Sequence, residues 1–269
     1  LRRMVENEQG PEMTKYTAEG TSHTIDIDGL NIHYHDLGSG VPVIMLHGGG
    51  PGASGWSNYN RNADVLAARY RLIIVDMPGY GKSSKPDMSN DPFGHRAQVL
   101  LRMVDALGLE KPHLIGNSLG GAVALRMALE ASDKVGKVIL MGPGGGVSPH
   151  QLTPTQGLLE LLFYYAGGTP TREKLASFLK HLVFDQSSIT DELIDQRYQA
   201  SIEADVLACP PLTLPKGPVR GVDLWRDPRL QFLGNEVLVI WGAEDKVNPA
   251  DGALLFQRLI PRCDTYIFS

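Results

Sequence analysis

The strongest chemical signal in the sequence is a serine flanked by glycines, Gly-Asn-Ser-Leu-Gly at residues 116–120. It follows the apolar run 113–115 and opens a helix-patterned stretch. A strained strand-to-helix turn of this kind needs glycine on both sides, because a β-carbon there would clash with neighbouring backbone. The turn presents the serine oxygen at a helix N-terminus. The pattern therefore predicts a nucleophile elbow with Ser118 as nucleophile.

A glycine-rich loop upstream supplies candidate donors for an oxyanion. The apolar run 43–46 leads into His-Gly-Gly-Gly-Pro-Gly at residues 47–52, whose backbone amides are bare. We expect the N–H groups of Gly49 and of Leu119, the residue after the nucleophile, to form an oxyanion hole. The alternative is a plain flexible turn. His47 ends the strand, and we expect it to brace the loop and not to act as a base.

The acid of a serine triad should follow a late strand, and the histidine should follow the acid. Trp-Gly-Ala-Glu-Asp at residues 241–245 follows the apolar run 237–240, which makes Asp245 the predicted acid and Glu244 and Asp251 its competitors. All eight histidines precede Asp245, so the triad histidine is absent from this sequence. The chain begins without methionine and ends in what looks like a final strand, so we expect a truncated form of a longer enzyme.

The elements that must position these residues alternate between strand and helix. A hairpin is expected over residues 22–37, with its turn at Asp28 and Gly29. Dense apolar runs predict strands buried on both faces at residues 43–46, 72–75, 113–115, 138–141 and 237–240. Helical periodicity marks residues 96–107, 119–131 and 252–259. The order predicts a mostly parallel sheet covered by helices, with reactive residues at the carboxyl ends of strands.

The alternation stops between residues 141 and 237, where helices are expected at 154–165, 171–182 and 190–203 and a proline-rich irregular stretch at 209–221. We interpret this segment as an inserted lid. The prediction is an α/β-hydrolase fold with a polar N-terminal extension (1–21), a first core part (22–145), a helical lid (146–235) and a second core part (236–269) that stops before the catalytic histidine loop.

Composition narrows the function classes. The 269 residues carry a net charge of -5, which gives no field that would attract nucleic acid or an anionic membrane. The two cysteines have neither disulfide nor metal-ligand spacing, and no signal peptide or membrane span is visible, so a soluble cytoplasmic protein is expected. Gly81-Lys82-Ser83 fails as a phosphate-binding loop because Asp76 occupies the required glycine position. No cofactor or metal is implied.

Several motifs together resemble one family. They are His-Gly-Gly-Gly-Pro-Gly-Ala at 47–53, Trp-Ser-Asn-Tyr at 56–59, Gly-Asn-Ser-Leu-Gly-Gly at 116–121, Met-Gly-Pro-Gly-Gly at 141–145 and Trp-Gly-Ala-Glu-Asp at 241–245. From the first hairpin to Ser269 the chain resembles the meta-cleavage product hydrolases of biphenyl, carbazole, dioxin and steroid catabolism. The departure from the family is the absent histidine and the tryptophan that normally follows it.

The resemblance implies hydrolysis of a carbon–carbon bond in a 2-hydroxy-6-oxohexa-2,4-dienoate. The products would be 2-hydroxypenta-2,4-dienoate and a carboxylic acid, formed when Ser118 attacks C6 after ketonisation of the dienol. The partner is thus a small-molecule dienoate, and a homo-oligomer is a family expectation. The C6 substituent stays open, with a bulky aryl group favoured.

The resemblance also implies which residues bind substrate. Arg197 occupies the family's arginine position, and a planar guanidinium suits bidentate binding of a carboxylate on a protein that is acidic overall. Asn117 and Asn58 match polar positions near the dienoate end, and Gly48 and Gly50 border it. Three lid leucines are expected around the C6 substituent: Leu158, Leu162 and Leu182.

Two other functions stay open at this stage. A serine esterase or lactonase could use the same fold and the same elbow. A non-catalytic binding protein of the hydrolase fold would explain the missing histidine. Haloalkane dehalogenation is disfavoured, because that chemistry needs a carboxylate where Ser118 stands.

Overall fold

The computed structural model describes residues 15–145, 153–212 and 222–269, and these contain an eight-stranded sheet in the order β1-β2-β4-β3-β5-β6-β7-β8. Strands β1 (Ser22–Ile27) and β2 (Leu30–Gly38) form the predicted antiparallel hairpin. Its turn residues Asp28 and Gly29 have φ angles of 53° and 82°, the left-handed conformation that a tight hairpin requires. The mostly parallel sheet with flanking helices is the α/β-hydrolase fold that the sequence predicted.

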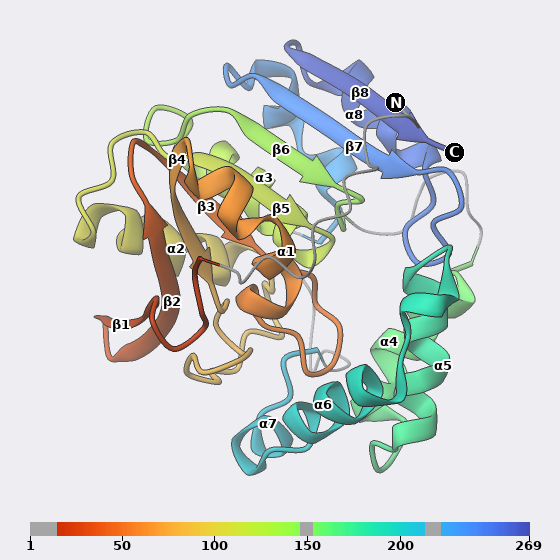
Figure 1. The fold of residues 1–269 in the computed structure, drawn as a ribbon. Helices are drawn as coiled ribbons and strands as arrows, with labels where there is room; N and C mark the ends of the chain where they lie inside the picture. Colours follow the sequence, from red (N-terminus) through yellow and green to blue (C-terminus); the bar gives the residue numbers. More distant parts are fainter. Residues whose placement is uncertain (1–14, 146–152, 213–221) are drawn as a thin grey trace, which may run out of the picture.

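The remaining six strands are parallel to one another. The hairpin joins them through β2, which pairs antiparallel with β4. The six parallel strands are β3 (Val41–Leu46), β4 (Tyr70–Val75), β5 (His113–Asn117), β6 (Val138–Met141), β7 (Val237–Gly242) and β8 (Cys263–Phe268). Figure 1 shows their arrowheads directed to the same edge of the sheet. Loops that leave β3, β5 and β7 therefore meet at one edge, and these loops carry the candidate site residues.

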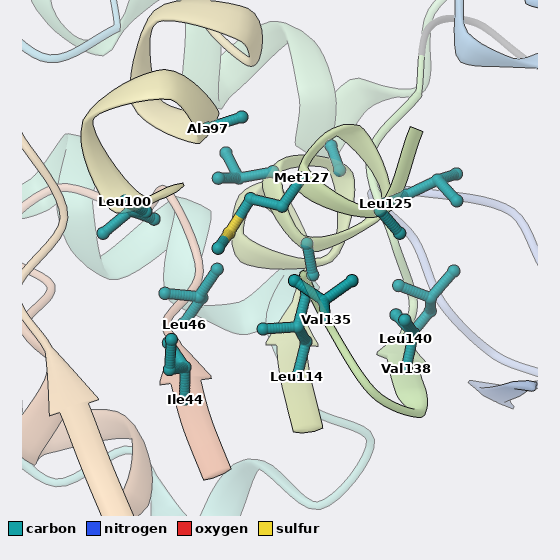
Figure 2. Close-up of a cluster of buried hydrophobic side chains, with 14 of the residues drawn as sticks. Ile44, Leu46, Ala97, Leu100, Leu114, Leu125, Met127, Val135, Val138 and Leu140 are labelled. Carbon is teal, nitrogen blue, oxygen red and sulfur yellow. The ribbon is translucent and has the colours of Figure 1, made fainter. Parts of the chain in front are cut away.

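Both faces of the central strands are buried, which explains why their sequences are continuous apolar runs. Ile44 and Leu46 of β3 pack with α2 (Gly94–Ala106) and α3 (Leu119–Glu130) in the larger cluster, part of which Figure 2 shows. Val43 and Met45 point to the opposite face and pack with α1 (Gly55–Ala67). Helix α8 (Asp251–Leu259) adds Phe256 to the larger cluster.

Helix α1 was missed by the sequence prediction. Its buried stripe is Gly55, Tyr59, Ala63 and Ala67, which repeats every four residues but contains only one large side chain. Ser54 caps the helix by accepting a hydrogen bond from the N–H of Ser57. The four-residue spacing and this cap were the usable signals.

The lid segment contains α4 (Gln156–Ala166), α5 (Arg172–Leu182), α6 (Asp191–Ser201) and the short α7 (Ala204–Ala208). The first three match the predicted helices within a few residues, and Figure 1 shows them beside the sheet edge where the strands end. They share a small apolar core of their own. Most of the predicted extension 1–21, residues 146–152 at the start of the predicted lid and most of the proline-rich stretch 209–221 lie outside the described residues.

Three short helical turns complete the described elements: η1 (Gln186–Ser188), η2 (Leu224–Arg226) and η3 (Pro228–Phe232). Within the described part of the chain, no helix has the length and apolar character needed to cross a bilayer.

Candidate active site

Ser118 stands at the end of β5 with φ 50° and ψ −112°, a backbone conformation that a non-glycine residue rarely adopts. Its N–H donates to the Met141 carbonyl (2.9 Å), and its carbonyl accepts from Gly144 (2.9 Å). A β-carbon at Gly116 would collide with the Gly120 carbonyl, and one at Gly120 would collide with the Leu46 carbonyl. The glycines therefore permit the sharp turn that the sequence pattern predicted.

The loop after β3 lies against this turn. Gly49 packs so closely on Leu119 that an added β-carbon would lie 3.0 Å from the Leu119 Cδ2 atom. Leu119 is the first residue of α3, so its N–H has no acceptor within the helix. The Gly49 N–H also finds no protein acceptor among the described residues. The two amides predicted for an oxyanion hole are thus neighbours and are available to a ligand.

His47 is fully buried and both of its ring nitrogens are occupied. Nδ1 donates to the Gly48 carbonyl (2.8 Å), and Nε2 accepts from the Met77 N–H (3.0 Å). Burial lowers the pKa of His47 to about 4, so the ring is neutral at pH 7. The residue braces the loop, as the sequence predicted.

Asn58 of α1 connects the glycine loop to the residue before the nucleophile. Its side-chain oxygen accepts from the Gly48 N–H (3.1 Å) and from the Asn117 amide (3.1 Å). The predicted polar residues Asn58, Asn117 and Gly48 therefore form one hydrogen-bonded group beside Ser118. Sequence reasoning named these residues but could not have derived the bonds between them.

Asp245 is held by the loop that follows β7. Its Oδ1 atom accepts from the N–H groups of Val247 (2.8 Å) and Asn248 (2.9 Å), and Oδ2 accepts from the indole of Trp241 (3.2 Å). Burial raises the pKa of Asp245, and these three hydrogen bonds oppose the rise. The competitor Glu244 is exposed. The supporting role of Trp241 was missed, although its position four residues before Asp245 was visible.

Arg197 reaches the glycine loop from lid helix α6. Its Nε donates to the Pro51 carbonyl (2.8 Å), and an added β-carbon at Gly50 would lie 2.8 Å from its Nη2. A β-carbon at Gly52 would collide with the Arg197 carbonyl. Burial lowers the pKa of Arg197 to about 10. The glycines at 50 and 52 thus allow α6 to approach the loop closely.

One cavity of about 490 Å³ brings most of the predicted residues together. It is bordered by loop and core residues on one side and by lid side chains on the other: Gly48, Gly49, Gly50, Asn58, Asn117, Ser118, Arg197 and Asp245, with Leu161, Phe178, Leu182 and Val183. Of the three lid leucines predicted to line it, only Leu182 does so. Leu158 packs instead with the apolar core of the lid. Leu161 and Phe178, buried within the lid, were missed.

None of the histidines in the described ranges lines this cavity; they are His23, His33, His35, His47, His95, His113 and His181. His33 is instead hydrogen-bonded to Asp76 (2.8 Å), and His181 to Glu160 (3.3 Å). His150 lies outside the described residues. The cavity thus brings a serine together with a partly buried carboxylate and a partly buried cation, and the two free amides lie beside the serine. This arrangement is suited to nucleophilic attack on the carbonyl of an anionic molecule.

Comparisons with known proteins agree with this geometry. The model of the alpha/beta hydrolase fold matches residues 41–269. A 2-hydroxy-6-oxo-6-phenylhexa-2,4-dienoate hydrolase from Burkholderia cepacia is 43% identical over 265 residues, which cover 95% of this chain and 91% of the relative. A 2-hydroxy-6-oxononadienedioate/2-hydroxy-6-oxononatrienedioate hydrolase from Comamonas testosteroni is 41% identical, over 91% of this chain and 86% of the relative.

A similar solved structure is a meta-cleavage product hydrolase from Pseudomonas fluorescens IP01, a serine-to-alanine variant complexed with acetates. It has a TM-score of 0.79 and 33% sequence identity, over 91% of this chain and 88% of that chain. At these identities and coverages the likeness extends beyond the fold.

Proposed function

The chain belongs to the meta-cleavage product hydrolases of the alpha/beta hydrolase fold, enzymes that hydrolyse carbon–carbon bonds in aromatic catabolism, and from this premise we propose its substrate and the roles of its residues. The substrate is a 2-hydroxy-6-oxohexa-2,4-dienoate with an apolar, aryl-sized group at C6. One observation supports this most strongly: the elbow serine and the partly buried Arg197 border the same cavity.

Arg197 binds the carboxylate end of the dienoate. Its Nε is already held by Pro51, so the Nη atoms are the donors left for a bidentate contact. Asn117 and Asn58, with Gly48 and Gly50 beside them, border this end. Desolvation strengthens a charge-assisted bond here relative to one in water.

Ser118 performs the covalent chemistry. Ketonisation moves the enol proton to C5, and Ser118 Oγ then attacks C6, whose oxygen becomes an oxyanion held by the N–H groups of Gly49 and Leu119. Collapse breaks the C5–C6 bond, and its electron pair is delocalised toward the C2 oxygen before protonation gives 2-hydroxypenta-2,4-dienoate. Water then hydrolyses the acyl-serine to the carboxylic acid. Asp245 is the proposed acid of the triad, and it orients a histidine base.

The lid side of the cavity receives the C6 substituent. Leu161, Phe178, Leu182 and Val183 supply an apolar wall opposite the elbow. Phe178 is 1% exposed and packs inside the lid core, so this wall is firmly supported. A flat aryl ring suits such a surface better than a charged chain does.

The test follows the yellow absorbance of 2-hydroxy-6-oxo-6-phenylhexa-2,4-dienoate. Decay is measured for residues 1–269, for the reading frame carried past Ser269, and for the Ser118→Ala variant of each. We expect serine-dependent decay with benzoate as product, strongest in a form that supplies a histidine. Hydrolysis of simple esters with no dienoate decay would support an esterase instead. Dienoate binding without turnover of either substrate would support a binding protein.

Two finer expectations are also proposals: cysteine usage supports the cellular location, and the family resemblance supports the assembly. We propose that the protein works in the cytoplasm and assembles as a homo-oligomer. Light scattering on the purified protein would test the assembly, and a single-subunit mass would contradict it.

A further inference from the structure

A line of buried contacts connects the end of the lid to the oxyanion loop. It runs from Pro211, which follows α7, through Arg96 of α2 and Tyr80 to Gly49. Arg96 and Tyr80 are 1% and 2% exposed. Neither borders the cavity that holds Ser118, so neither contacts substrate there.

Arg96 is a buried cation that binds only carbonyl groups among the described residues. Its Nε donates to Pro78 (2.9 Å), its Nη1 to Pro92 (2.8 Å) and its Nη2 to Pro211 (3.2 Å). Burial lowers its pKa, since no carboxylate compensates the desolvated charge. The three carbonyls belong to the turn after β4, the segment before α2 and the end of the lid, and Arg96 joins them.

Tyr80 lies between Arg96 and the oxyanion loop. The Arg96 guanidinium lies 5.6 Å from the Tyr80 ring centroid, and the Tyr80 hydroxyl donates to the Gly49 carbonyl (3.0 Å). The edge of the ring also contacts His47, with ring centroids 5.0 Å apart. Burial raises the pKa of Tyr80, so the hydroxyl remains a donor at every physiological pH.

These contacts fix both peptide planes that flank the Gly49 Cα atom. The plane that contains the Gly49 N–H also contains the Gly48 carbonyl, which His47 holds. The next plane contains the Gly49 carbonyl, which Tyr80 holds. Glycine rotates freely at both torsions, so the direction of its N–H depends on such external restraints.

We propose that Tyr80 and Arg96 are positioning residues that aim the Gly49 N–H at the oxyanion and tie its orientation to the end of the lid at Pro211. This rests on the proposed function, in which Gly49 supplies an oxyanion donor. A misdirected Gly49 N–H leaves the proposed ground-state contacts of Arg197, Asn117 and Asn58 in place, but it stabilises the developing charge less well.

The decisive variant is Tyr80→Phe, and Tyr59→Phe is its matched control. Tyr59 is 3% exposed, and its hydroxyl donates to the Leu46 carbonyl (2.8 Å), only three residues before Gly49. Both changes remove one buried hydroxyl that donates to a backbone carbonyl, and the Tyr59 hydroxyl also has a hydrogen bond with the Asn117 backbone, so we expect Tyr59→Phe to lower the urea midpoint at least as far as Tyr80→Phe. Only Tyr80→Phe should lower kcat, by roughly 10-fold to 100-fold, with KM unchanged.

A transition-state mimic gives a second readout. Phenylboronic acid forms a tetrahedral adduct with a serine hydroxyl and places an oxygen at the oxyanion hole. Its affinity should fall in Tyr80→Phe by about the same factor as kcat, while benzoate, which forms no adduct, binds both variants equally. Equal kcat losses in both tyrosine variants, or none in either, would show that Tyr80 is only structural.

The link to the lid is tested by Arg96→Lys, which keeps the charge but loses the fork that reaches Pro211. If Arg96 acts through Tyr80, the double variant is no slower than Tyr80→Phe alone. If the two losses of kcat multiply in the double variant, the link is refuted. If Arg96→Lys does not fold, the comparison of Tyr80→Phe with Tyr59→Phe still decides the role of Tyr80. Hydrolysis of a 4-nitrophenyl ester also passes through an oxyanion. The kcat values of the variants can therefore be compared with this ester even if the dienoate is not cleaved.

Discussion

Replacement of Arg197 by methionine should separate the stability of the fold from its activity. The guanidinium is partly buried at the border of the cavity and forms no ion pair among the described residues. Burial lowers its pKa to about 10, which corresponds to a folding cost of ~3 kcal/mol. At pH 7 the arginine is protonated in the folded and the unfolded chain alike, so the full cost is present at neutral pH.

Arg197→Met removes this cost and keeps an apolar side chain of similar reach. The variant also loses the bond from Nε to the Pro51 carbonyl (2.8 Å), and an unsatisfied carbonyl costs ~1–3 kcal/mol. The two effects leave a net change between about 0 and +2 kcal/mol in the free energy of unfolding. Activity should behave differently, because loss of a charge-assisted clamp on the substrate carboxylate lowers kcat/KM by roughly 100-fold or more.

Urea unfolding at pH 7 and dienoate kinetics measure the two quantities on the same preparations. Arg96→Met is the control, because Arg96 satisfies three carbonyls and its removal should cost at least ~3 kcal/mol. If Arg197→Met lost more than ~2 kcal/mol of stability, the arginine would be structural and the reasoning wrong. Unchanged kcat/KM would remove Arg197 from the substrate site.

Three further outcomes follow from the same geometry. Ser118→Ala should lower kcat by ~10⁴-fold or more while dienoate still binds, and stopped-flow turnover near the parental rate would exclude the nucleophile. Gly120→Ala should cost more than ~3 kcal/mol because its β-carbon meets the Leu46 carbonyl, whereas Gly242→Ala, with open space around it, should melt near the parent; matching melts for the two variants would contradict the elbow. Because the pKa of His47 is about 4 in the fold and higher in the unfolded chain, the unfolding free energy should fall by up to ~3 kcal/mol as pH drops from 6.5 to 4, and flat urea titrations over that window would be inconsistent with a buried neutral ring.

The core strands could be predicted because each is marked by a short run of consecutive apolar residues. Strands buried on both faces are largely apolar, and β3, β4, β6 and β7 contain the continuous apolar runs 43–46, 72–75, 138–141 and 237–240. Helix α1 was not predicted because three of its four buried residues are small. Gly55, Ala63 and Ala67 contribute little to a periodic hydrophobic pattern, and Tyr59 is the one large buried side chain. The formation of α1 depends on packing against the sheet that it covers, and a local sequence pattern does not contain that information.

The site divides in the same way. Ser118, Gly49 and Leu119 lie within two short motifs, because the elbow and the loop after β3 are formed by consecutive residues. Tyr80 and Trp241 were missed as supports, since the atoms they hold are known only once the turns have folded. The positions of Leu158 and Leu182 on their helices did not reveal which would face the cavity.

Arg197 shows why the glycine loop is more specific than the elbow. The elbow requires glycines only for its own turn, at 116 and 120, and any serine hydrolase of this fold has that need. Gly50 and Gly52 are required for a different reason, because their missing β-carbons leave space for the side chain and the carbonyl of Arg197. The glycines of this loop are therefore needed because Arg197, which is 146 residues after Pro51 in the sequence, packs against the loop. The glycine motif and Arg197 thus depend on each other for packing, and together they place a cation beside the serine. Their joint occurrence therefore indicates an anionic substrate, whereas the elbow alone does not.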